Sequence, residues 1–232
     1  MRIFLFQTAI GKKHDFMGTE IVTIDTAHPE PVFARCRDVI GSGGVIAYPT
    51  DTFYGLGADP RNPDAVKRLF EIKGRPAGQP ILLLLHDRSR VREWAQGVTA
   101  EAETLMDAFW PGPLTLVFTA LPSVLQELTG GTGRIGLRVP GNEVTRRLLD
   151  ALGTALTGTS ANRSGDPDLQ TAQDVAGVLG DRVDLILDAG RTLGGKASSV
   201  VDVSAAGLTM VREGAVSEQE IKNTWHKFKK KA

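Results

Sequence analysis

With 232 residues, of which 41% are hydrophobic, the chain is long enough to bury one substantial core. Its 27 Lys and Arg residues equal its 27 Asp and Glu residues, which excludes a global field drawing it to nucleic acid or an anionic membrane. Cys36 is the only cysteine, which excludes an intramolecular disulfide and a cysteine-cluster metal site and favours the reducing cytoplasm. No apolar run approaches the roughly 20 residues that a membrane-spanning helix needs.

The amino-terminal segment MRIFLFQTAIGKKH is apolar only briefly, and its basic cluster follows the apolar part. A secretory signal has the opposite order and a small-residue cleavage site, so the segment does not read as a signal. Met17 offers a second start. We therefore expect residues 1–16 to be a disordered or atypical extension and residues 17–232 to form a single domain.

The first predicted elements are a helix, a strand and a loop. Residues 30–40 carry apolar side chains at a helical spacing, and the following GSGG ends that helix. VIAYP at 45–49 predicts a strand. TDTFYGLGADP at 50–60 shows neither helix nor strand periodicity, so we expect a loop there.

A second helix is predicted by its caps. Asn62, followed by a proline, is typical of a helix start, and Gly74 is typical of a helix end. This places Lys73 in the last helical turn and Arg75 just beyond it. The apolar run ILLLL at 81–85 lacks alternation, as expected of a central strand that is covered on both faces.

Strand-like and helix-like segments continue to alternate to about residue 211 without a linker, charge block or repeat. This alternation predicts one continuous α/β domain. Asn142 and Thr171 have the character of helix N-caps. The remaining expected elements are helices at about 100–109, 143–152 and 172–180, and strands at about 114–118, 134–140, 154–157, 185–188, 198–204 and 209–213.

Four segments concentrate small polar or cationic residues next to glycine: TDTFYGLG, KGRP, GTSAN and GGKASSVVD. Ligands of α/β sheets bind at strand ends, where rigid elements hold loops with available backbone N–H groups, so we expect a shared pocket. KGRP offers Lys73 and Arg75, and GTSAN offers Gly158, Ser160 and Asn162. Fixed cations, hydroxyl and amide groups and a glycine are the groups that bind a triphosphate.

Each of these residues also has an interpretation without a ligand. Lys73 in a last helical turn complements the helix dipole. Residues 50–52 are turn formers, and residues 160–162 fit an Asx-type turn. Both interpretations stay open at the level of local sequence.

Several common sites are excluded by spacing. GSGG, TGGTG and GGKASS match neither a P-loop nor a dinucleotide-binding fingerprint. Asn162 stands where the nucleophile elbow of a serine hydrolase requires its second glycine. The histidines form no i, i+4 pair, which argues against a zinc hydrolase; they are His14, His28, His86 and His226.

Six motifs in order give the chain a specific resemblance: PTDTFYGLGADP, KGRPAGQPI, WPGPLTLVF, GLRVP, TSANRSGDPD and SSVVDVS. Over about residues 22–214 it resembles the YrdC/TsaC family, the threonylcarbamoyl-AMP synthases. The resemblance implies an enzyme that joins L-threonine, bicarbonate or CO2, and ATP into threonylcarbamoyl-adenylate with release of pyrophosphate. The product serves the N6-threonylcarbamoyl modification of adenosine 37 in tRNA.

The resemblance also implies roles for individual residues. The family's catalytic KxR and SxN tetrad falls on Lys73, Arg75, Ser160 and Asn162. Positions matching threonine contacts are Thr52, Arg138 and Ser198, with Arg138 pairing with the amino acid's carboxylate. Positions matching ATP contacts are Arg75, Gln79, Arg134, Gly158, Ser160 and Arg212.

The fold implied by the resemblance is a YrdC-like three-layer α/β domain, in its short single-domain form, with a twisted mixed sheet around a deep electropositive cavity. Mg²⁺ is expected with ATP, held largely through phosphates and water, so no dedicated metal ligands are expected. Gln79 and Leu84 depart from relatives that have asparagine and histidine there. Leu84 has no polar group, which puts the threonine contact at this position in doubt.

Two alternatives come from other classes. One is an RNA-binding module that uses the same cationic cavity, although zero net charge and 6% aromatic residues supply neither phosphate neutralisation nor base stacking well. The other is a carbamoyl-adenylate-forming domain like that of hydrogenase-maturation proteins. The product is expected to pass to a tRNA threonylcarbamoyl-transfer complex, with weak RNA binding left open and no membrane partner.

Overall fold

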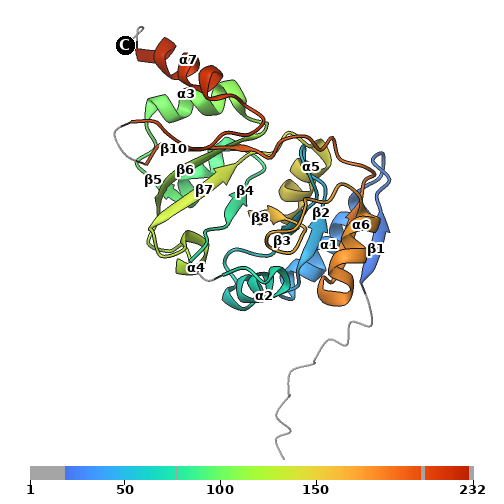
Figure 1. Cartoon of the computed structure of the whole chain (residues 1–232). Coiled ribbons are helices and arrows are strands. Elements are labelled where there is room, and N and C mark those ends of the chain that lie inside the picture. Colours follow the sequence, from blue (N-terminus) through green and yellow to red (C-terminus); the bar gives the residue numbers. More distant parts are fainter. Residues whose placement is uncertain (1–18, 77, 205–206, 230–232) are drawn as a thin grey trace, which may run out of the picture.

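The computed structural model of the chain describes residues 19–76, 78–204 and 207–229, and it confirms the α/β class: a twisted mixed sheet is covered by helices (Figure 1). The extension expected at residues 1–16 lies outside the described residues. None of the helices in the described ranges is long and apolar enough to cross a bilayer.

The strands of the described residues are β1 (Glu20–Thr23), β2 (Ile46–Tyr48), β3 (Gly55–Gly57), β4 (Leu82–Leu84), β5 (Ala95–Gln96), β6 (Leu114–Ala120), β7 (Arg134–Arg138), β8 (Leu156–Ser160), β9 (Leu185–Asp188), β10 (Ser199–Asp202) and β11 (Thr209–Arg212). The helices are α1 (Glu30–Gly41), α2 (Pro63–Lys73), α3 (Ala100–Phe109), α4 (Gln126–Thr129), α5 (Glu143–Leu152), α6 (Ala172–Leu179) and α7 (Glu218–Lys229). Two short 3-10 helices span Arg88–Glu93 and Gly180–Arg182.

The sheet is continuous and joins its two halves at β8. Its strands are hydrogen-bonded in the order β1-β9-β2-β3-β8-β4-β7-β6-β10-β11, and β5 pairs with β6. Strand β8 is antiparallel both to β3, which belongs to one half, and to β4, which belongs to the other. The strand that ends in GTS therefore lies in the middle of the molecule, and β4 is central, as its leucine run predicts.

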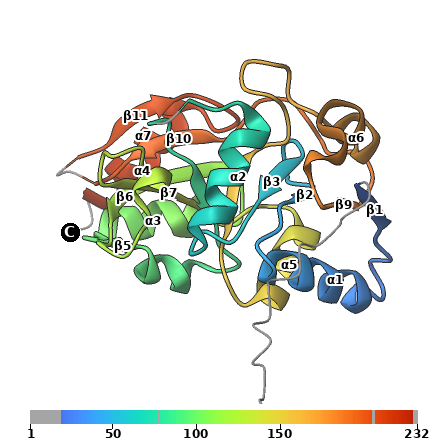
Figure 2. The same cartoon turned by 90° about the horizontal axis from the view of Figure 1, so that it is seen from below.

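Helices cover both faces of the sheet, because the buried strands alternate between two cores. In the strand around β2, Val45 and Ala47 join a core with α2 and α6, whereas Ile46 and Tyr48 join a core with α1 and α5. Figure 2 shows α1 and α5 side by side along one half of the sheet. The result is the expected three-layer arrangement of helix, sheet and helix.

Helix α2 begins and ends where its caps predict. The Asn62 side chain accepts hydrogen bonds from the N–H groups of Asp64 and Ala65. Gly74 closes the helix with a φ of 58°, a left-handed conformation that favours glycine. This precise end matters for the site, because it fixes where Lys73 and Arg75 leave the helix.

The expected loop at 50–60 contains a strand. Residues 55–57 form β3, which pairs antiparallel with β2 and β8. A Cβ atom on Gly57 would lie 2.7 Å from Cε1 of Tyr48, so the tyrosine ring occupies the space that a side chain would need. The strand depends on pairing and on this close approach, which the local pattern GLG does not reveal.

Candidate active site

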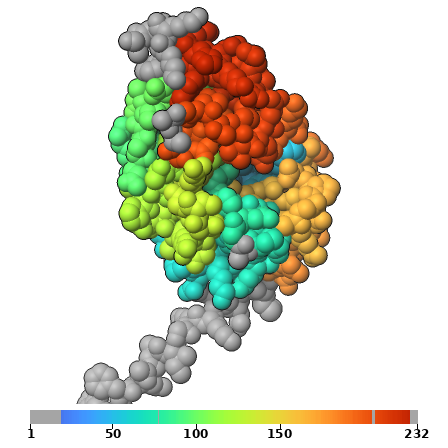
Figure 3. All heavy atoms as spheres, turned by 60° about the vertical axis from the view of Figure 1, so that its left-hand side comes forward, coloured from blue at the N-terminus to red at the C-terminus, as the bar shows by residue number. Residues whose placement is uncertain are grey.

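A cavity of about 890 Å³ is lined by strands from both halves of the sheet. Figure 3 shows a hollow where the segment after α2 meets β7 and the β10–β11 pair. Most of the residues that the resemblance singled out line this cavity: Thr52, Arg75, Arg134, Arg138, Gly158, Ser160, Ser198 and Arg212.

A second cavity of about 430 Å³ adjoins the first, because Arg75 and Ser160 line both. The three remaining expected residues, Lys73, Gln79 and Asn162, line this smaller space. The KGRP and GTSAN segments, which lie far apart in the sequence, therefore meet here. The structure thus brings all of the expected site residues to two connected spaces.

Lys73 is buried and bonded to the turn at 160–162. Its ammonium donates to the main-chain oxygen of Ser160, to that of Asn162 at 2.8 Å, and to Oδ1 of Asn162 at 3.0 Å. These bonds use all three of its N–H groups. In this structure Lys73 holds the turn in place, and the direct contact with a phosphate that the KGRP segment predicts requires one of these bonds to open.

Burial disfavours the charged form of the Lys73 amine. Desolvation, followed by the positive charge of Arg75, lowers the pKa of Lys73 to about 8, and the negative charge of Asp168 opposes this shift. The lowered pKa still leaves most of the amine protonated at neutral pH.

Asn162 is also engaged within its own turn. Its Oδ1 accepts from Ser160 Oγ at 2.6 Å as well as from Lys73, and its Nδ2 donates to the main-chain oxygen of Asp166 at 2.5 Å. These donors to Oδ1 are side chains, and the N–H of Ser164 donates to the main-chain oxygen of Lys73, so the segment does not form the Asx-type turn that was one interpretation of it. The hydroxyl oxygen of Ser160 keeps its acceptor capacity, and Ser160 faces both cavities.

Arg75 supplies a cation to both cavities. Its Nη2 donates to the main-chain oxygen of Pro80 at 2.8 Å, and its Nε lies 3.4 Å from that of Gln79. These neutral acceptors orient the guanidinium without neutralising its charge. Burial lowers the pKa of Arg75, yet an arginine keeps its proton at neutral pH.

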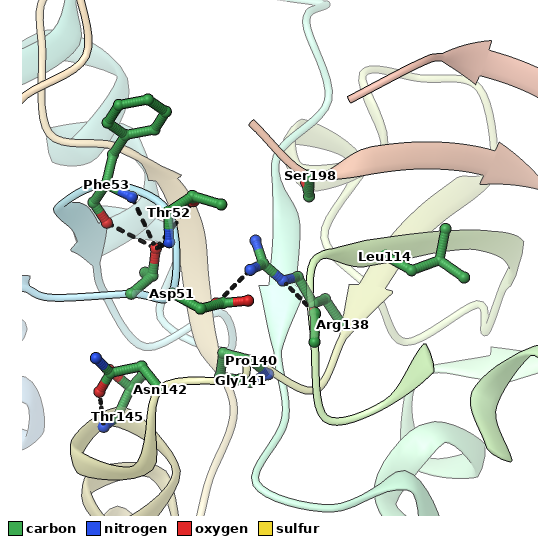
Figure 4. A network of polar contacts seen from close by, with 12 residues as sticks. Asp51, Thr52, Phe53, Leu114, Arg138, Pro140, Gly141, Asn142, Thr145 and Ser198 are labelled. Carbon is green, nitrogen blue, oxygen red and sulfur yellow. Dashed lines mark hydrogen bonds and ion pairs between the residues drawn. The ribbon is translucent and has the colours of Figure 1, made fainter. Parts of the chain in front are cut away.

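Arg138, which also lines the larger cavity, forms an ion pair with Asp51 (Figure 4). Only 5% of the Arg138 side chain and 12% of the Asp51 side chain are exposed. Arg138 Nε also donates to the main-chain oxygen of Gly112 at 2.9 Å. Thr52 and Ser198, both buried, lie on either side of this arginine in Figure 4.

Two further arginines of the cavity, Arg134 and Arg212, are each bonded to another residue that lines it. Arg134 pairs with Asp202, which also accepts from the N–H of Ser204 at 2.8 Å. Arg212 Nη2 donates to the main-chain oxygen of Ser198 at 2.8 Å. The carboxylates of Asp202 and Asp51 offset part of the positive charge of Arg134 and Arg138. The electropositive character expected of the cavity therefore stays a prediction.

The floor of the cavity is apolar. Leu84 is buried between β7 and β8, in register with Arg138 on one side and Leu156 on the other. A Cβ atom on Gly158 would lie 2.5 Å from Cδ1 of Leu82 and 3.0 Å from Cγ of Leu84. Glycine at position 158 is therefore needed for these leucines to pack beneath the cavity.

Sequence reasoning missed two carboxylates of the site. Asp51 was interpreted as a turn former or as part of a ligand-binding loop, and Asp202 as part of a strand, and neither was predicted to pair with an arginine. The available signals were the position of Asp51 beside Thr52 and an acidic residue directly after Val200 and the buried Val201. Neither signal identifies the arginine that each carboxylate pairs with.

The described residues contain no group of three or more neighbouring His, Cys, Asp or Glu side chains that could hold a metal ion. The carboxylates that line the larger cavity are Asp168 and Asp202, and Asp202 is paired with Arg134. Ser160, with its free acceptor capacity, is the residue that fits a water ligand of a nucleotide-bound cation.

A cavity of this size, with an apolar floor and converging arginine and hydroxyl groups, has the character of a small-molecule site. The protein-family model Sua5/YciO/YrdC, described as "Telomere recombination", matches residues 38–214. The chain therefore belongs to the Sua5/YciO/YrdC family.

Relatives in this family are similar in sequence and in structure. Threonylcarbamoyl-AMP synthase of Pyrococcus abyssi is 36% identical over 182 residues, which cover 78% of this chain and 54% of that protein. The protein of the same name from Idiomarina loihiensis is 36% identical over 174 residues, covering 74% of this chain and 92% of that protein. The crystal structure of P. abyssi Sua5 complexed with L-threonine superposes with a TM-score of 0.85 at 33% identity, covering 89% of this chain and 61% of that one. The chain thus spans little more than half the length of the Pyrococcus relative.

Proposed function

We propose that this protein is an L-threonylcarbamoyladenylate synthase, which makes its product from L-threonine, bicarbonate or CO2, and ATP, with release of pyrophosphate. The observation that carries the proposal is the convergence of the family's expected residues on two connected cavities. The names of the relatives, and the L-threonine bound to P. abyssi Sua5, support it.

The amino acid occupies the end of the larger cavity around Arg138. The guanidinium pairs with the α-carboxylate, since a planar fork of N–H donors matches a carboxylate. The hydroxyl groups of Thr52 and Ser198 flank this position and hydrogen-bond to the amino acid. The floor at Leu84 contacts it only through apolar atoms.

The nucleotide phosphates occupy the junction of the two cavities. Arg75, which faces both spaces, binds the β- and γ-phosphates and stabilises the leaving pyrophosphate. Ser160 contacts a phosphate oxygen or the hydration shell of Mg²⁺, and Lys73 and Asn162 keep its turn in place. Arg134, Arg212, Gln79 and the backbone at Gly158 complete the contacts with ATP. Mg²⁺ carried by the nucleotide, with Ser160 at its hydration shell, would supply charge neutralisation on the phosphate oxygens.

The chemistry has two bond-forming steps. The neutral amine of threonine attacks the carbon of CO2 and gives a carbamate, with loss of one proton to solvent. A carbamate oxygen then attacks the α-phosphorus of ATP, and the bond to pyrophosphate breaks. Neither step needs a protein nucleophile, so the protein acts by holding the two substrates in line and by neutralising charge on the oxygens.

The product is a labile mixed anhydride, and a second protein must use it promptly. We propose that it passes to a complex that transfers the threonylcarbamoyl group to adenosine 37 of tRNA. A direct affinity for RNA, if the cavity rim provides one, falls steeply with salt.

The proposal is tested by measuring pyrophosphate release with ATP, bicarbonate and each amino acid in turn. L-Threonine should support release, whereas L-serine, which lacks only the methyl group, should support it less well, since one methyl group is worth about tenfold in discrimination. Carbamoyl phosphate in place of the amino acid and bicarbonate is the comparison for the hydrogenase-maturation chemistry. Release with carbamoyl phosphate but not with threonine would overturn the proposal.

A further inference from the structure

Asp51 lies behind Arg138 and does not line the cavity. It belongs to the loop between β2 and β3, and its Oδ1 accepts from Arg138 Nη2. Its Oδ2 is buried and has no hydrogen-bond partner. A carboxylate that bonds to a cavity arginine through one oxygen and does not itself line the cavity has the geometry of a support for its neighbour, not of a contact with a substrate.

Two bonds from different segments fix the guanidinium of Arg138. Asp51 holds Nη2, and the main-chain oxygen of Gly112 holds Nε. An arginine has five N–H groups, so three remain beyond these two bonds. With Nε and Nη2 both held, the plane of the Arg138 guanidinium is fixed, and so is the direction in which its remaining N–H groups point (Figure 4).

The loop that carries Asp51 is itself held in place. Oγ1 of Thr50 accepts from the N–H groups of Thr52 and Phe53, both at 3.2 Å. Oγ1 of Thr145, at the start of α5, donates to the main-chain oxygen of Pro49. The start of the β2–β3 loop is thus joined to the first turn of α5, and Arg138 lies at the end of β7, the strand that precedes this helix.

Gly141, in the connection between β7 and α5, lies directly against the carboxylate. A Cβ atom there would be 3.0 Å from Oδ2 of Asp51 and 3.3 Å from its Cβ. The contact comes from Asp51 itself, and only 12% of that side chain is exposed, which limits its room to move. A side chain at position 141 would therefore push the Asp51 carboxylate by a few tenths of an ångström.

We propose that Asp51 is a positioning residue, which orients Arg138 to receive the α-carboxylate of the amino acid substrate. The inference rests on the proposed function, because that function supplies the carboxylate. The same loop carries Thr52, so one segment sets the placement of two groups that contact the amino acid. Asp51 also balances the buried charge of Arg138 when no substrate is bound, which keeps the guanidinium from turning to other acceptors.

The variant Asp51→Ala removes both the hydrogen bond and the charge, and Asp51→Asn keeps an acceptor for Arg138 but removes the charge. A hydrogen bond between charged groups is worth about tenfold to a hundredfold in an equilibrium constant. We expect Asp51→Ala to raise the Kd for L-threonine by about this factor, and Asp51→Asn to raise it by less. The affinity for ATP should not change.

The decisive comparison uses L-threoninol, in which a CH2OH group replaces the carboxylate. Calorimetric titrations of the wild type and both variants with L-threonine and with L-threoninol separate orientation of Arg138 from general damage. The inference predicts a loss of affinity for threonine with no loss for threoninol. An equal loss for both ligands, or no loss for either, overturns it.

Two further variants separate the positioning role of Asp51 from general damage to the protein. Gly141→Ala shifts the carboxylate slightly without removing it and should give a smaller loss of the same kind, for threonine and not for threoninol. Asp107→Asn, which removes an exposed carboxylate paired with Arg88 on the surface, is the control and should bind threonine normally.

If wild-type protein makes adenylate from threonine and Asp51→Ala binds threonine normally, only the positioning role fails. If wild-type protein neither binds threonine nor makes adenylate from it, the proposed function fails and the inference falls with it.

Discussion

Replacing Lys73 with methionine removes a buried ammonium and keeps most of the side chain's volume. Lys73 is 2% exposed and donates three hydrogen bonds to the turn at 160–162. The variant loses these bonds but also loses the cost of burying a charge, so we expect it to be less stable by only about 1–3 kcal/mol at neutral pH. It should also lose most of its activity, because Ser160 and Asn162 lose their support.

The pH dependence of this difference follows from the lowered pKa. Burial, and then the charge of Arg75, lowers the pKa of Lys73 from its ordinary 10.5 to about 8. Between these two values the unfolded chain binds a proton at Lys73 that the native protein has released, so the free energy of unfolding rises with pH across this window. The rise amounts to roughly 3 kcal/mol over the whole window.

The assay is urea unfolding of wild type and Lys73→Met at pH values below, within and above the window. Because the variant has no amine at position 73, the stability advantage of the wild type should grow with pH from about 8 upward. Lys67→Met, at an exposed position of the same helix, is the matched control. A difference between wild type and Lys73→Met that stays constant across the window would refute the reasoning.

Three further predictions concern other residues. Arg75→Ala should lower threonine-dependent pyrophosphate release by about a hundredfold or more with little change in thermal stability, and near-normal turnover would contradict its role. Ser199→Ala should cost about 3 kcal/mol in urea unfolding, because the hydroxyl accepts from the N–H groups of Gly214 and Val216 and all three groups are buried. Gly158→Ala should cost about 1–3 kcal/mol in the same measurement, because its Cβ would overlap Leu82, and an unchanged midpoint would argue against this packing.

Helix boundaries were predictable because their causes are local. Asn62, Asn142 and Thr171 each cap the helix that follows, as expected from a polar side chain ahead of an apolar stripe. Gly153 ends α5 with a φ of 66°, as expected of a glycine that follows the last helical residue. The leucine run likewise predicted a central strand, because burial on both faces removes the need for alternation.

Strand pairing was not predictable in the same way. Strand β3 is two glycines and a leucine, and it exists because β2 and β8 lie on either side of it. The prediction of a loop there was wrong for this reason. The predicted strand at 154–157 was placed early, since β8 runs from 156 to 160 and contains the GTS that we expected in a loop.

In the site, too, the sequence identified individual residues but not the non-local contacts between them. The resemblance identified residues that the structure brings to two connected cavities, although their roles stay predictions. The partners of those residues required the fold, because Arg138 and Asp51 are 87 positions apart and Arg134 and Asp202 are 68 apart. The sequence also could not indicate that the ammonium of Lys73 is fully bonded to a turn on another strand.

The most direct test of the account is the isotopic composition of the product. Purified protein is incubated with ATP, L-threonine and ¹³C-bicarbonate, and the nucleotide products are separated and weighed by mass spectrometry. The account predicts threonylcarbamoyl-adenylate that carries one ¹³C atom, formed together with pyrophosphate and absent with Arg75→Ala. Pyrophosphate release without a labelled adenylate, or a labelled adenylate that forms without threonine, would contradict it.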